Sequence, residues 1–592
     1  MTLKLINKNS VIFWTIFIVL ILLRLWLISG IPKMYIWGLH DDLYFAKAAH
    51  TIIHGEWLGA YDQMTLIKNP FYAFFLILSF GTGLPLFFNE SIFYVVACIL
   101  IFIAFIPLIK NPWWRMFLFS LLLFCPESMT TAWNLRIYRE FIYFSLTLYV
   151  VASSIGLFLR LDKNIFTLLL WSILLGMSMG AFMLTREEGV WIYPPLILIL
   201  SISIFWIWKK KYEKKILRSC LVLMPILIWY IPIFVVSAIN YSHYGFWGTT
   251  EQLDPDFNRV LIILDRIETD DDTWHPAIQI PKSARLKAYT ASPILNSMRD
   301  DIEYLVAAWN ISDDLAMELK NDWYLDQYGD GGSEIGSHFL WLFRDVVCQN
   351  GHCKNATATK EFYKQLADQL EVACDDGTLV CSSTKAIPFV GLIDQRHYPI
   401  ISRMFLENIL SILNLDYFGM VTLDVLTWPS LPENSEDYKY FDEFAYNPID
   451  YLKLQINTND LYIVNGNMDL RLRILSIKEN IIGKIAKFYK DLINPGFIIT
   501  FISWIFIMVI SLFKKQLSDQ ITFFIITLYL MSLMMIRVMT LTIVDSTTSA
   551  AGSIYSASNF IFVYIFIGTV SIRFLIGLIQ TLKHTVIRNN GN

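Results

Sequence analysis

A series of long apolar runs, most of them near the length that crosses a lipid bilayer, constrains the fold of this 592-residue chain more than any other feature. A hydrocarbon core about 30 Å thick is crossed by a helix of about 20 predominantly apolar residues. Hydrophobic residues make up 55% of the chain and charged residues only 17%, which is typical of a polytopic membrane protein. The runs cover residues 11–29, 70–88, 91–109, 112–129, 141–159, 165–184, 190–208, 217–238, 497–513, 519–541 and 554–580.

Basic residues gather at alternate ends of these runs and predict the orientation of the chain. Such residues favour the cytoplasmic side of a membrane. The first run follows Lys4 and Lys8 and contains Arg24, so we interpret it as an uncleaved span with a cytoplasmic N-terminus. The remaining basic flanks are Lys110, Arg115, Arg160, Lys163, the run 209–215, Lys514, Lys515 and the tail 583–588.

The run 70–88 is the exception to this pattern. It begins at Pro70 and contains Gly81 and Pro85, which interrupt helices. Two full crossings between Pro70 and Lys110 would also place Lys110 on the wrong side of the membrane. We therefore expect a half-inserted helix on the outer leaflet here, and ten crossings in the whole chain.

The segment 240–492 differs from its surroundings, because it is rich in acidic residues and in Gly, Pro and Asn. We predict a large extracytoplasmic domain of mixed α/β structure, inserted before the last three helices. Helices are expected over 298–320 and 358–374, and a hairpin over 460–476. The predicted organisation is a transmembrane catalytic module at 1–239 with an outer-face loop at 30–69, the soluble domain at 240–492, and C-terminal membrane helices at 493–592.

Four cysteines lie in this domain, at Cys348, Cys353, Cys374 and Cys381. An oxidising compartment favours disulfides, and bonds between sequence neighbours, Cys348 to Cys353 and Cys374 to Cys381, are the simplest of three pairings. A zinc site that uses His352 is the alternative, although the spacings fit no usual zinc finger.

Charged residues also gather at the outer ends of the apolar runs, where ionisable groups are costly and mark candidate functional sites. They are Asp41 and Asp42 after the first run, Lys68, Arg136, Arg139 and Glu140, Arg186 and Glu187, and Arg537 inside a late run.

Each of these residues also has a structural interpretation. Asp41 and Asp42 could cap a helix that starts near Leu43. The Arg139 and Arg186 groups could be interfacial salt bridges, and Arg537 could reach the membrane surface from its helix. His40 with Asp41 and Asp42 could instead hold a divalent metal, so the cofactor is left open.

The loop after the first run resembles that of the GT-C class of membrane glycosyltransferases. The resemblance rests on Asp41-Asp42, Tyr44 and the stretch MTLIKNPFYAFFL at 64–76, and it covers mostly residues 1–240, with weaker support at 530–560. The class includes protein O-mannosyltransferases and bacterial aminoarabinose transferases. This chain has a single proline, Pro70, and an Asp-Asp pair where many members have two prolines and Asp-Glu, so the subfamily and acceptor stay open.

The resemblance implies transfer of a sugar from a polyprenyl-phosphate donor to a glycan, lipid or protein acceptor on the outer face, with inversion. Asp41 or Asp42 would be the catalytic base, with Asp41 slightly favoured. Residues that would hold the substrates are Lys68, Arg136, Arg139, Glu140, Arg186, Glu187 and Arg537. The expected location is a bacterial inner membrane, with the active site and the large domain outside.

Other classes of function remain alternatives. The chain has no GxxxxGK[ST], GxGxxG or HExxH motif that would indicate a nucleotide-dependent enzyme or a zinc protease, and we expect no nucleic-acid partner. A lipid or polysaccharide transporter or flippase would hold its charges near the bilayer midplane. A membrane-anchored binding protein would act through the domain 240–492.

Overall fold

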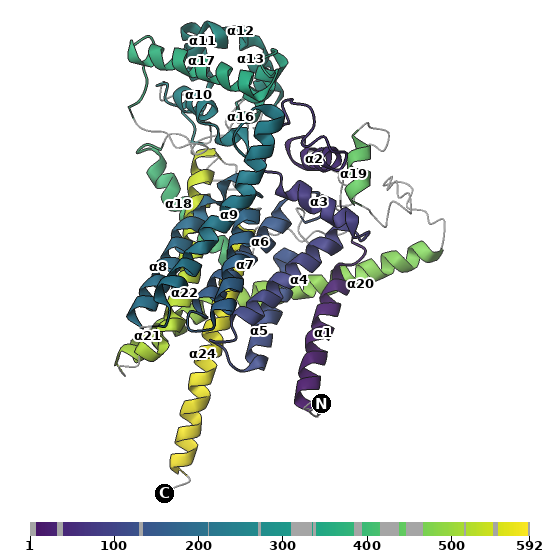
Figure 1. The fold of residues 1–592 in the computed structure, drawn as a ribbon, viewed down its shortest axis with the longest axis vertical. Helices are drawn as coiled ribbons and strands as arrows, with labels where there is room; N and C mark the ends of the chain where they lie inside the picture. The colour runs from purple at the N-terminus through teal and green to yellow at the C-terminus, as the bar shows by residue number, and fades with distance from the viewer. Residues whose placement is uncertain are drawn as a thin grey trace.

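The computed structural model consists of a bundle of long helices with a smaller helical domain at one end (Figure 1). The structure describes residues 8–589 except 32, 34–38, 130–133, 211, 270–273, 277, 310–333, 336–338, 384–392, 415–436, 446–465, 514–516 and 549–554.

Nine helices within the described residues are long and apolar enough to cross a membrane. Many of their large side chains face outward, such as Leu227, which is 72% exposed, as expected of a lipid-facing surface. The chain is therefore a polytopic α-helical membrane protein. The nine helices are α1 (Lys8–Ile28), α4 (Leu86–Ala104), α6 (Glu140–Phe158), α7 (Ile165–Met183), α8 (Tyr193–Lys209), α9 (Lys215–Tyr244), α21 (Asn494–Phe513), α22 (Leu517–Thr548) and α24 (Ala557–Asn589).

The prediction of ten crossing helices is wrong for the run 112–129, which is not among the nine described helices long enough to cross. This run forms α5 (Pro112–Leu123), whose 12 residues rise only about 18 Å. A short turn at Pro126–Ser128 follows, and the chain then reaches the other end of the bundle, where Arg139 donates to the carbonyl of Thr185. Irregular backbone is tolerated at membrane depth when protein surrounds it, and Ser128 and Asn134 are both buried.

The run 70–88 forms the 11-residue helix α3 (Phe71–Gly81), too short to cross a bilayer. Gly83 then adopts a φ of +68°, which turns the chain into α4. The expected short helix is present, while its place on the outer leaflet remains a prediction.

Two glycines allow the close packing of α7 against α9. A methyl group at Gly176 would lie 2.5 Å from Ile228, and one at Gly180 would lie 2.5 Å from Pro232. Small residues four positions apart let membrane helices approach closely. This packing fixes the outer end of α7, which leads into the Arg186 segment.

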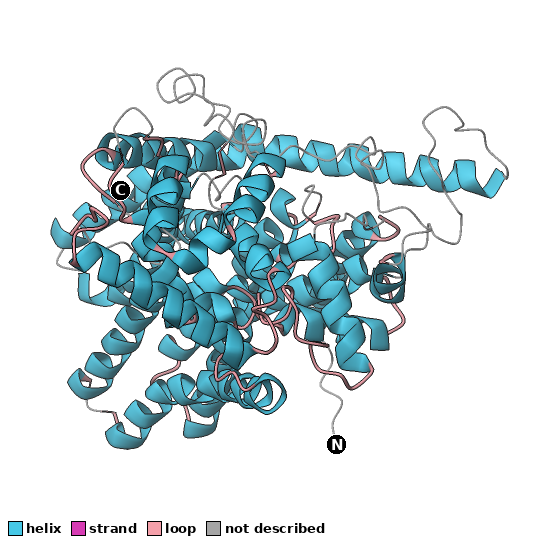
Figure 2. Cartoon of the chain, turned by 90° about the horizontal axis from the view of Figure 1, so that it is seen from above, coloured by secondary structure: helices cyan, strands magenta, loops and turns pink. Residues whose placement is uncertain are grey.

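The segment 240–492, which we call the outer domain after its predicted location, is helical in the residues that the structure describes, so the mixed α/β prediction is not supported there (Figure 2). The described β contact is one isolated bridge between Ile267 and Cys381. Its helices are α10 (Pro255–Asp265), α11 (Lys282–Ala291), α12 (Pro293–Ser297), α13 (Arg299–Ala308), α16 (Phe339–Gln349) and α17 (Ala356–Asp375). Two further helices of the segment pack against the bundle: α18 (His397–Asn414) contacts α21 and α22, and α19 (Tyr438–Ala445) contacts α2 (Tyr44–Ile53) and α3.

The detailed predictions for this domain had mixed outcomes. The helix expected at 358–374 is confirmed as α17, and α13 accounts for the first part of 298–320, whose remainder lies largely outside the described residues. The hairpin at 460–476 is wrong in its described part, because α20 (Gly466–Phe488) begins at Gly466. A short alternation of apolar residues suggested a strand, but the longer apolar pattern fits a helix.

Helix α20 packs against the membrane bundle. It crosses the bundle near the upper end of α1 and continues through Tyr489–Ile493 into α21 (Figure 1). The ammonium of Lys478 donates to the carbonyl of Ser29 at 2.6 Å, just past the end of α1. The chain therefore returns from the outer domain to the bundle through one long, interrupted helix.

Candidate functional site

The predicted site residues come together at the end of the bundle that carries the outer domain. A π-helical turn (Leu39–Leu43) and α2 (Tyr44–Ile53) follow α1, and α3 follows Lys68. The segments before α6 and α8 carry the arginines, while Arg537 projects from α22. Five stretches far apart in the sequence thus supply one cluster of charges.

Asp41 and Lys68 form a partly accessible ion pair of this cluster. Their side chains are 32% and 6% exposed, so the carboxylate reaches solvent while the ammonium is enclosed. The Tyr44 hydroxyl donates to the Lys68 carbonyl at 2.8 Å and fixes the backbone there. Burial would raise the pKa of Asp41, but Lys68, Arg139 and Arg136 lower that pKa to about 2.

Asp42 is fully buried and takes a different partner. Arg136 binds both of its oxygens, with the Nε atom 3.2 Å from Oδ1 and the Nη2 atom bonded to Oδ2. Burial is the largest influence here and raises the pKa of Asp42 to about 6, despite the attraction of Arg136. Of the two neighbouring carboxylates, only Asp41 is both accessible and firmly ionised near neutral pH.

Two further arginines form crossed ion pairs between the segments before α6 and α8. Arg139 binds Glu187, with Nη1 2.9 Å from Oε2, and Arg186 binds Glu140 and also Glu188. Glu187 additionally accepts from the backbone N–H of Asn69 at 2.8 Å. These contacts link the Lys68 segment to both arginine segments.

Arg537 differs from the other arginines because no carboxylate bonds to it in the described part of the chain. It is 1% exposed, donates to the Tyr555 carbonyl at 3.1 Å, and lies over the rings of Trp191 and Tyr143. Its Nε and Nη1 atoms are buried without a hydrogen-bond partner there. Buried donors left unpaired are costly, so this arginine is a candidate for binding an anion.

Sequence reasoning missed a second buried pair that supports the site. Lys33 lies 2.5 Å from Glu90, and the Tyr72 hydroxyl donates to Glu90 at 2.9 Å. Lys33 also donates to the Asn134 and Arg136 carbonyls, at 2.7 and 2.9 Å, and so holds the segment that carries Arg136. The signal available in the sequence was a carboxylate, Glu90, directly before a long apolar run.

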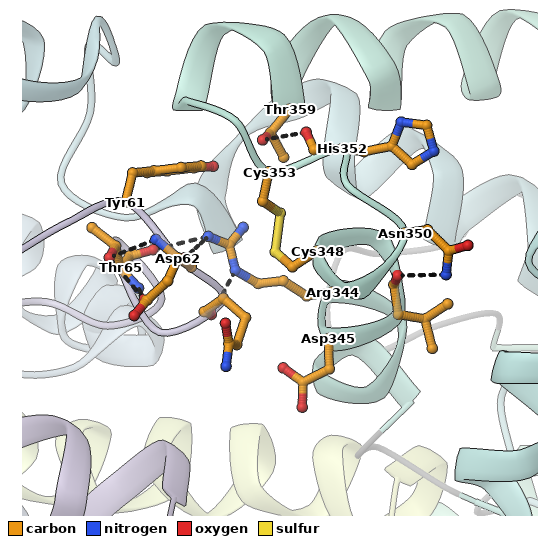
Figure 3. The surroundings of a disulfide bond; sticks show 12 residues. Tyr61, Asp62, Thr65, Arg344, Asp345, Cys348, Asn350, His352, Cys353 and Thr359 are labelled. Atoms are coloured by element: carbon orange, nitrogen blue, oxygen red, sulfur yellow. Dashed lines mark hydrogen bonds between the residues drawn. A yellow bond between two sulfur atoms is a disulfide. The ribbon is translucent and has the colours of Figure 1, made fainter.

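The outer domain covers this site with helix α16. Its Arg344 reaches into the first loop beside Asp62 and Thr65 (Figure 3). Arg344 donates to the carbonyls of Gln63 and Thr65 at 3.0 and 2.9 Å and pairs with Glu251. Trp341 of the same helix stacks on the His40 ring with centroids 5.3 Å apart, and the Lys68 ammonium lies 5.5 Å from the Trp341 ring centre. The outer domain therefore contributes directly to the surroundings of Asp41.

The predicted disulfides are confirmed. Cys348 bonds to Cys353 at the end of α16, and Cys374 bonds to Cys381 at the end of α17. The first bond lies beside the contact of Arg344 with the loop, as Figure 3 shows. The zinc alternative is wrong, because both cysteine pairs are oxidised and the His352 ring stacks on Phe362 at 4.1 Å.

The sequence left open whether His40, Asp41 and Asp42 hold a divalent metal, and the structure gives these side chains other partners. The Nε2 atom of His40 lies 3.4 Å from Asp345 of α16, whereas Asp41 and Asp42 pair with Lys68 and Arg136. Within the described residues, no group of three His, Cys, Asp or Glu side chains is placed to hold a metal ion.

These features define a polytopic helical membrane protein with a buried charge cluster at one end of its bundle. No protein-family model matches the chain, and no curated protein matches it. Two solved structures of ArnT from Cupriavidus metallidurans, apo and bound to undecaprenyl phosphate, align with 95% and 96% of this chain and with 77% and 78% of their own. Both alignments have 10% identity and a TM-score of 0.30, which is too low to establish a shared fold.

Proposed function

We propose that the protein is a membrane glycosyltransferase of the GT-C kind, which moves a sugar from a polyprenyl-phosphate donor to an acceptor on the extracytoplasmic face of a bacterial inner membrane. The observation that carries the proposal is Asp41, a partly exposed carboxylate beside enclosed arginines and their carboxylate partners, of which Glu188 is also partly exposed. Such a site offers a base to a hydroxyl and positive charge to a phosphate.

In the proposed step, the acceptor hydroxyl oxygen attacks the anomeric carbon of the donor sugar. The bond from that carbon to the phosphate oxygen breaks, and the hydroxyl proton passes to Asp41. The polyprenyl phosphate leaves with the bonding electron pair, and direct attack inverts the anomeric configuration. A positioned base typically contributes about 10² to 10⁴ in rate.

Because Asp41 pairs with Lys68, binding of the donor can change the basicity of Asp41. A carboxylate with a pKa of about 2 is a weak base. When a phosphate approaches, it competes with Asp41 for the Lys68 ammonium. Loss of the lysine would raise the pKa of Asp41, so the base becomes effective only when the donor is present.

Arg186 and Arg537 are the proposed partners of the departing phosphate. Both lie beside Tyr555: the Arg186 guanidinium lies 4.3 Å from its ring centre, and Arg537 donates to its carbonyl. The planar fork of arginine binds phosphate with two parallel donors, and the low dielectric at a membrane surface strengthens that attraction. Arg136, Arg139, Glu140 and Glu187 would position these groups through their ion pairs.

Sugar transfer from a panel of radiolabelled polyprenyl-phosphate sugars, measured in membranes that contain the full chain, tests this function. The double variant Asp41→Asn/Asp42→Asn should lose transfer at matched expression. Glu56→Gln is the matched control, since it neutralises an exposed acid of the same loop. If no donor is consumed, or the double variant transfers as fast as the control, the proposal is wrong.

A further inference from the structure

A cavity of about 680 Å³ lies at the opposite end of the bundle from the charge cluster. Its lining includes Phe158 at the last residue of α6, whose first residue is Glu140 of the charge cluster. The two ends of α6 are about 27 Å apart, given 1.5 Å per residue. The cavity is therefore separate from the proposed active site, and an inference about it does not depend on the proposed function.

Three cations line this cavity: Lys110 after α4, Lys210 after α8 and Arg573 in α24. The lining acid is Asp162, whose carboxylate pairs with Lys163 at 3.0 Å. The Lys210 ammonium lies 5.1 Å from the ring centre of Trp206, which also lines the cavity. The lining thus has surplus positive charge next to aromatic surface.

Two buried polar atoms of the lining have no hydrogen-bond partner among the described residues. They are the Thr569 hydroxyl oxygen and the Gln520 amide oxygen, and Thr569 is only 1% exposed. An orphaned hydroxyl inside a cavity costs free energy unless an occupant bonds to it. A hydroxyl next to cations is suited to donate to a phosphate oxygen.

We propose that this cavity binds the phosphate headgroup of an anionic phospholipid from the cytoplasmic leaflet. Lys110, Lys210 and Arg573 would surround the phosphate, Thr569 would donate to one of its oxygens, and Gln520 would accept from a headgroup hydroxyl. Apolar lining residues such as Leu108 and Ile576 would contact the upper acyl chain. Basic pockets between membrane helices on this side commonly hold anionic headgroups.

The lipid would join helices that are distant in the sequence. Lys110 and Lys210 belong to the N-terminal half of the bundle, while Gln520 and Arg573 belong to α22 and α24. Helix α22 also carries Arg537. A bound lipid would therefore hold the C-terminal helices against the rest of the bundle.

Thermal unfolding of the purified full chain in detergent tests the proposal, with added phosphatidylglycerol, phosphatidylcholine or inorganic phosphate. Phosphatidylglycerol should raise the unfolding midpoint, and the other two should not. The variant Lys110→Gln/Lys210→Gln/Arg573→Gln should weaken phosphatidylglycerol binding on the order of 100-fold. The matched control is Lys209→Gln/Lys214→Gln/Lys215→Gln, which removes the same charge outside the cavity lining and should keep the full shift.

Thr569→Val keeps the side-chain shape and removes the orphaned hydroxyl, so the chain should fold at least as stably without lipid. Its phosphatidylglycerol shift should nevertheless be smaller than that of the unaltered chain. The proposal is overturned if phosphatidylcholine gives the same shift, if inorganic phosphate alone produces it, or if the cavity variant and its control respond equally.

Discussion

The two ends of the bundle both carry many charges, but the partners of these charges differ. At the outer end Asp42, Arg139 and Arg186 are buried and locked into ion pairs. At the other end, the buried arginines Arg115, Arg160 and Arg218 donate to backbone carbonyls, and lysines such as Lys209 and Lys214 are exposed. A buried charge is costly unless it is paired and hydrogen-bonded, whereas an exposed charge costs little. The carboxylate-paired cluster is therefore the costlier arrangement, which supports the proposal that it forms the active site.

The largest expected effect separates the two kinds of arginine at the outer end. Arg537→Met should lower the transfer rate by about 10² to 10³, the usual loss for one transition-state donor. Thermal stability should be unchanged or higher, because two unpaired buried donors are removed. Arg139→Met leaves Glu187 buried without its partner and should cost about 3 to 5 kcal/mol.

Activity and unfolding measured on both variants check this contrast. An Arg537→Met protein that unfolds as easily as Arg139→Met would show that Arg537 is a structural residue.

The pH dependence separates the two carboxylates. Since the pKa of Asp42 is about 6, its pair with Arg136 is complete above that pH and is lost as the pH falls through it. Transfer should therefore fall as the pH drops below about 6 and level off near the rate of Asp42→Asn, whose neutral side chain mimics the protonated carboxyl. Asp41, with a pKa of about 2, stays ionised throughout this range.

Stability should respond in the opposite direction for Asp42. Its folded pKa is raised above the ordinary value of 3.8, so its contribution to stability is complete below about pH 4 and is lost as the pH rises through about 6. Asp41 has a lowered pKa, so its contribution is present above about pH 4 and is lost as the pH falls through about 2.

A transfer profile that stays flat from pH 5 to 8 would contradict the assignment of Asp42 to the active site.

A smaller effect is expected where the outer domain covers the site. Asp345→Asn replaces the carboxylate that faces the Nε2 atom of His40 at 3.4 Å, where the two side chains are only 8% and 14% exposed. A neutral amide can still bond to the ring, so the loss should be about 0.5 to 1.5 kcal/mol and transfer should change no more than about tenfold. Kinetics with the donor at saturating and limiting concentrations measure the change. A complete loss of transfer would show that α16 takes part in the chemistry itself.

The smallest effect is expected at the basic end. Lys209→Gln/Lys214→Gln should leave both transfer and stability nearly unchanged, within about 0.5 kcal/mol for exposed substitutions. The same assays and an unfolding curve measure it. A large loss of transfer would contradict the division of roles between the two ends.

The sequence predicted the positions of the charges better than their partners. Residues such as Asp41 and Arg139 stand out because ionisable groups beside apolar runs are costly. The crossed pairs of Arg139 with Glu187 and of Arg186 with Glu140 depend on how helices pack, which no spacing shows. The stacking of Trp341 on His40 joins segments about 300 positions apart. This contact also depends on tertiary packing, so the sequence did not predict it.

The fold shows the same division between local and long-range information. The disulfides followed from close spacing, and most membrane helices followed from apolar length. The half-length helix α5 was missed because residues 112–129 are apolar enough for a span, while the turn at Pro126 and the burial of Ser128 depend on neighbouring helices. The predicted hairpin failed because alternation over a few residues does not distinguish a strand from the start of a helix.

Single-turnover transfer by the purified full chain in lipid nanodiscs, with Asp41→Asn and Asp42→Asn measured separately, tests the central claim most directly. The account predicts that Asp41→Asn lowers the rate at neutral pH by at least about 100-fold, as expected when a base is lost, and still binds the donor. Asp42→Asn should keep a larger share of the rate. Equal rates for Asp41→Asn and the unaltered chain would contradict the assignment of Asp41 as the base.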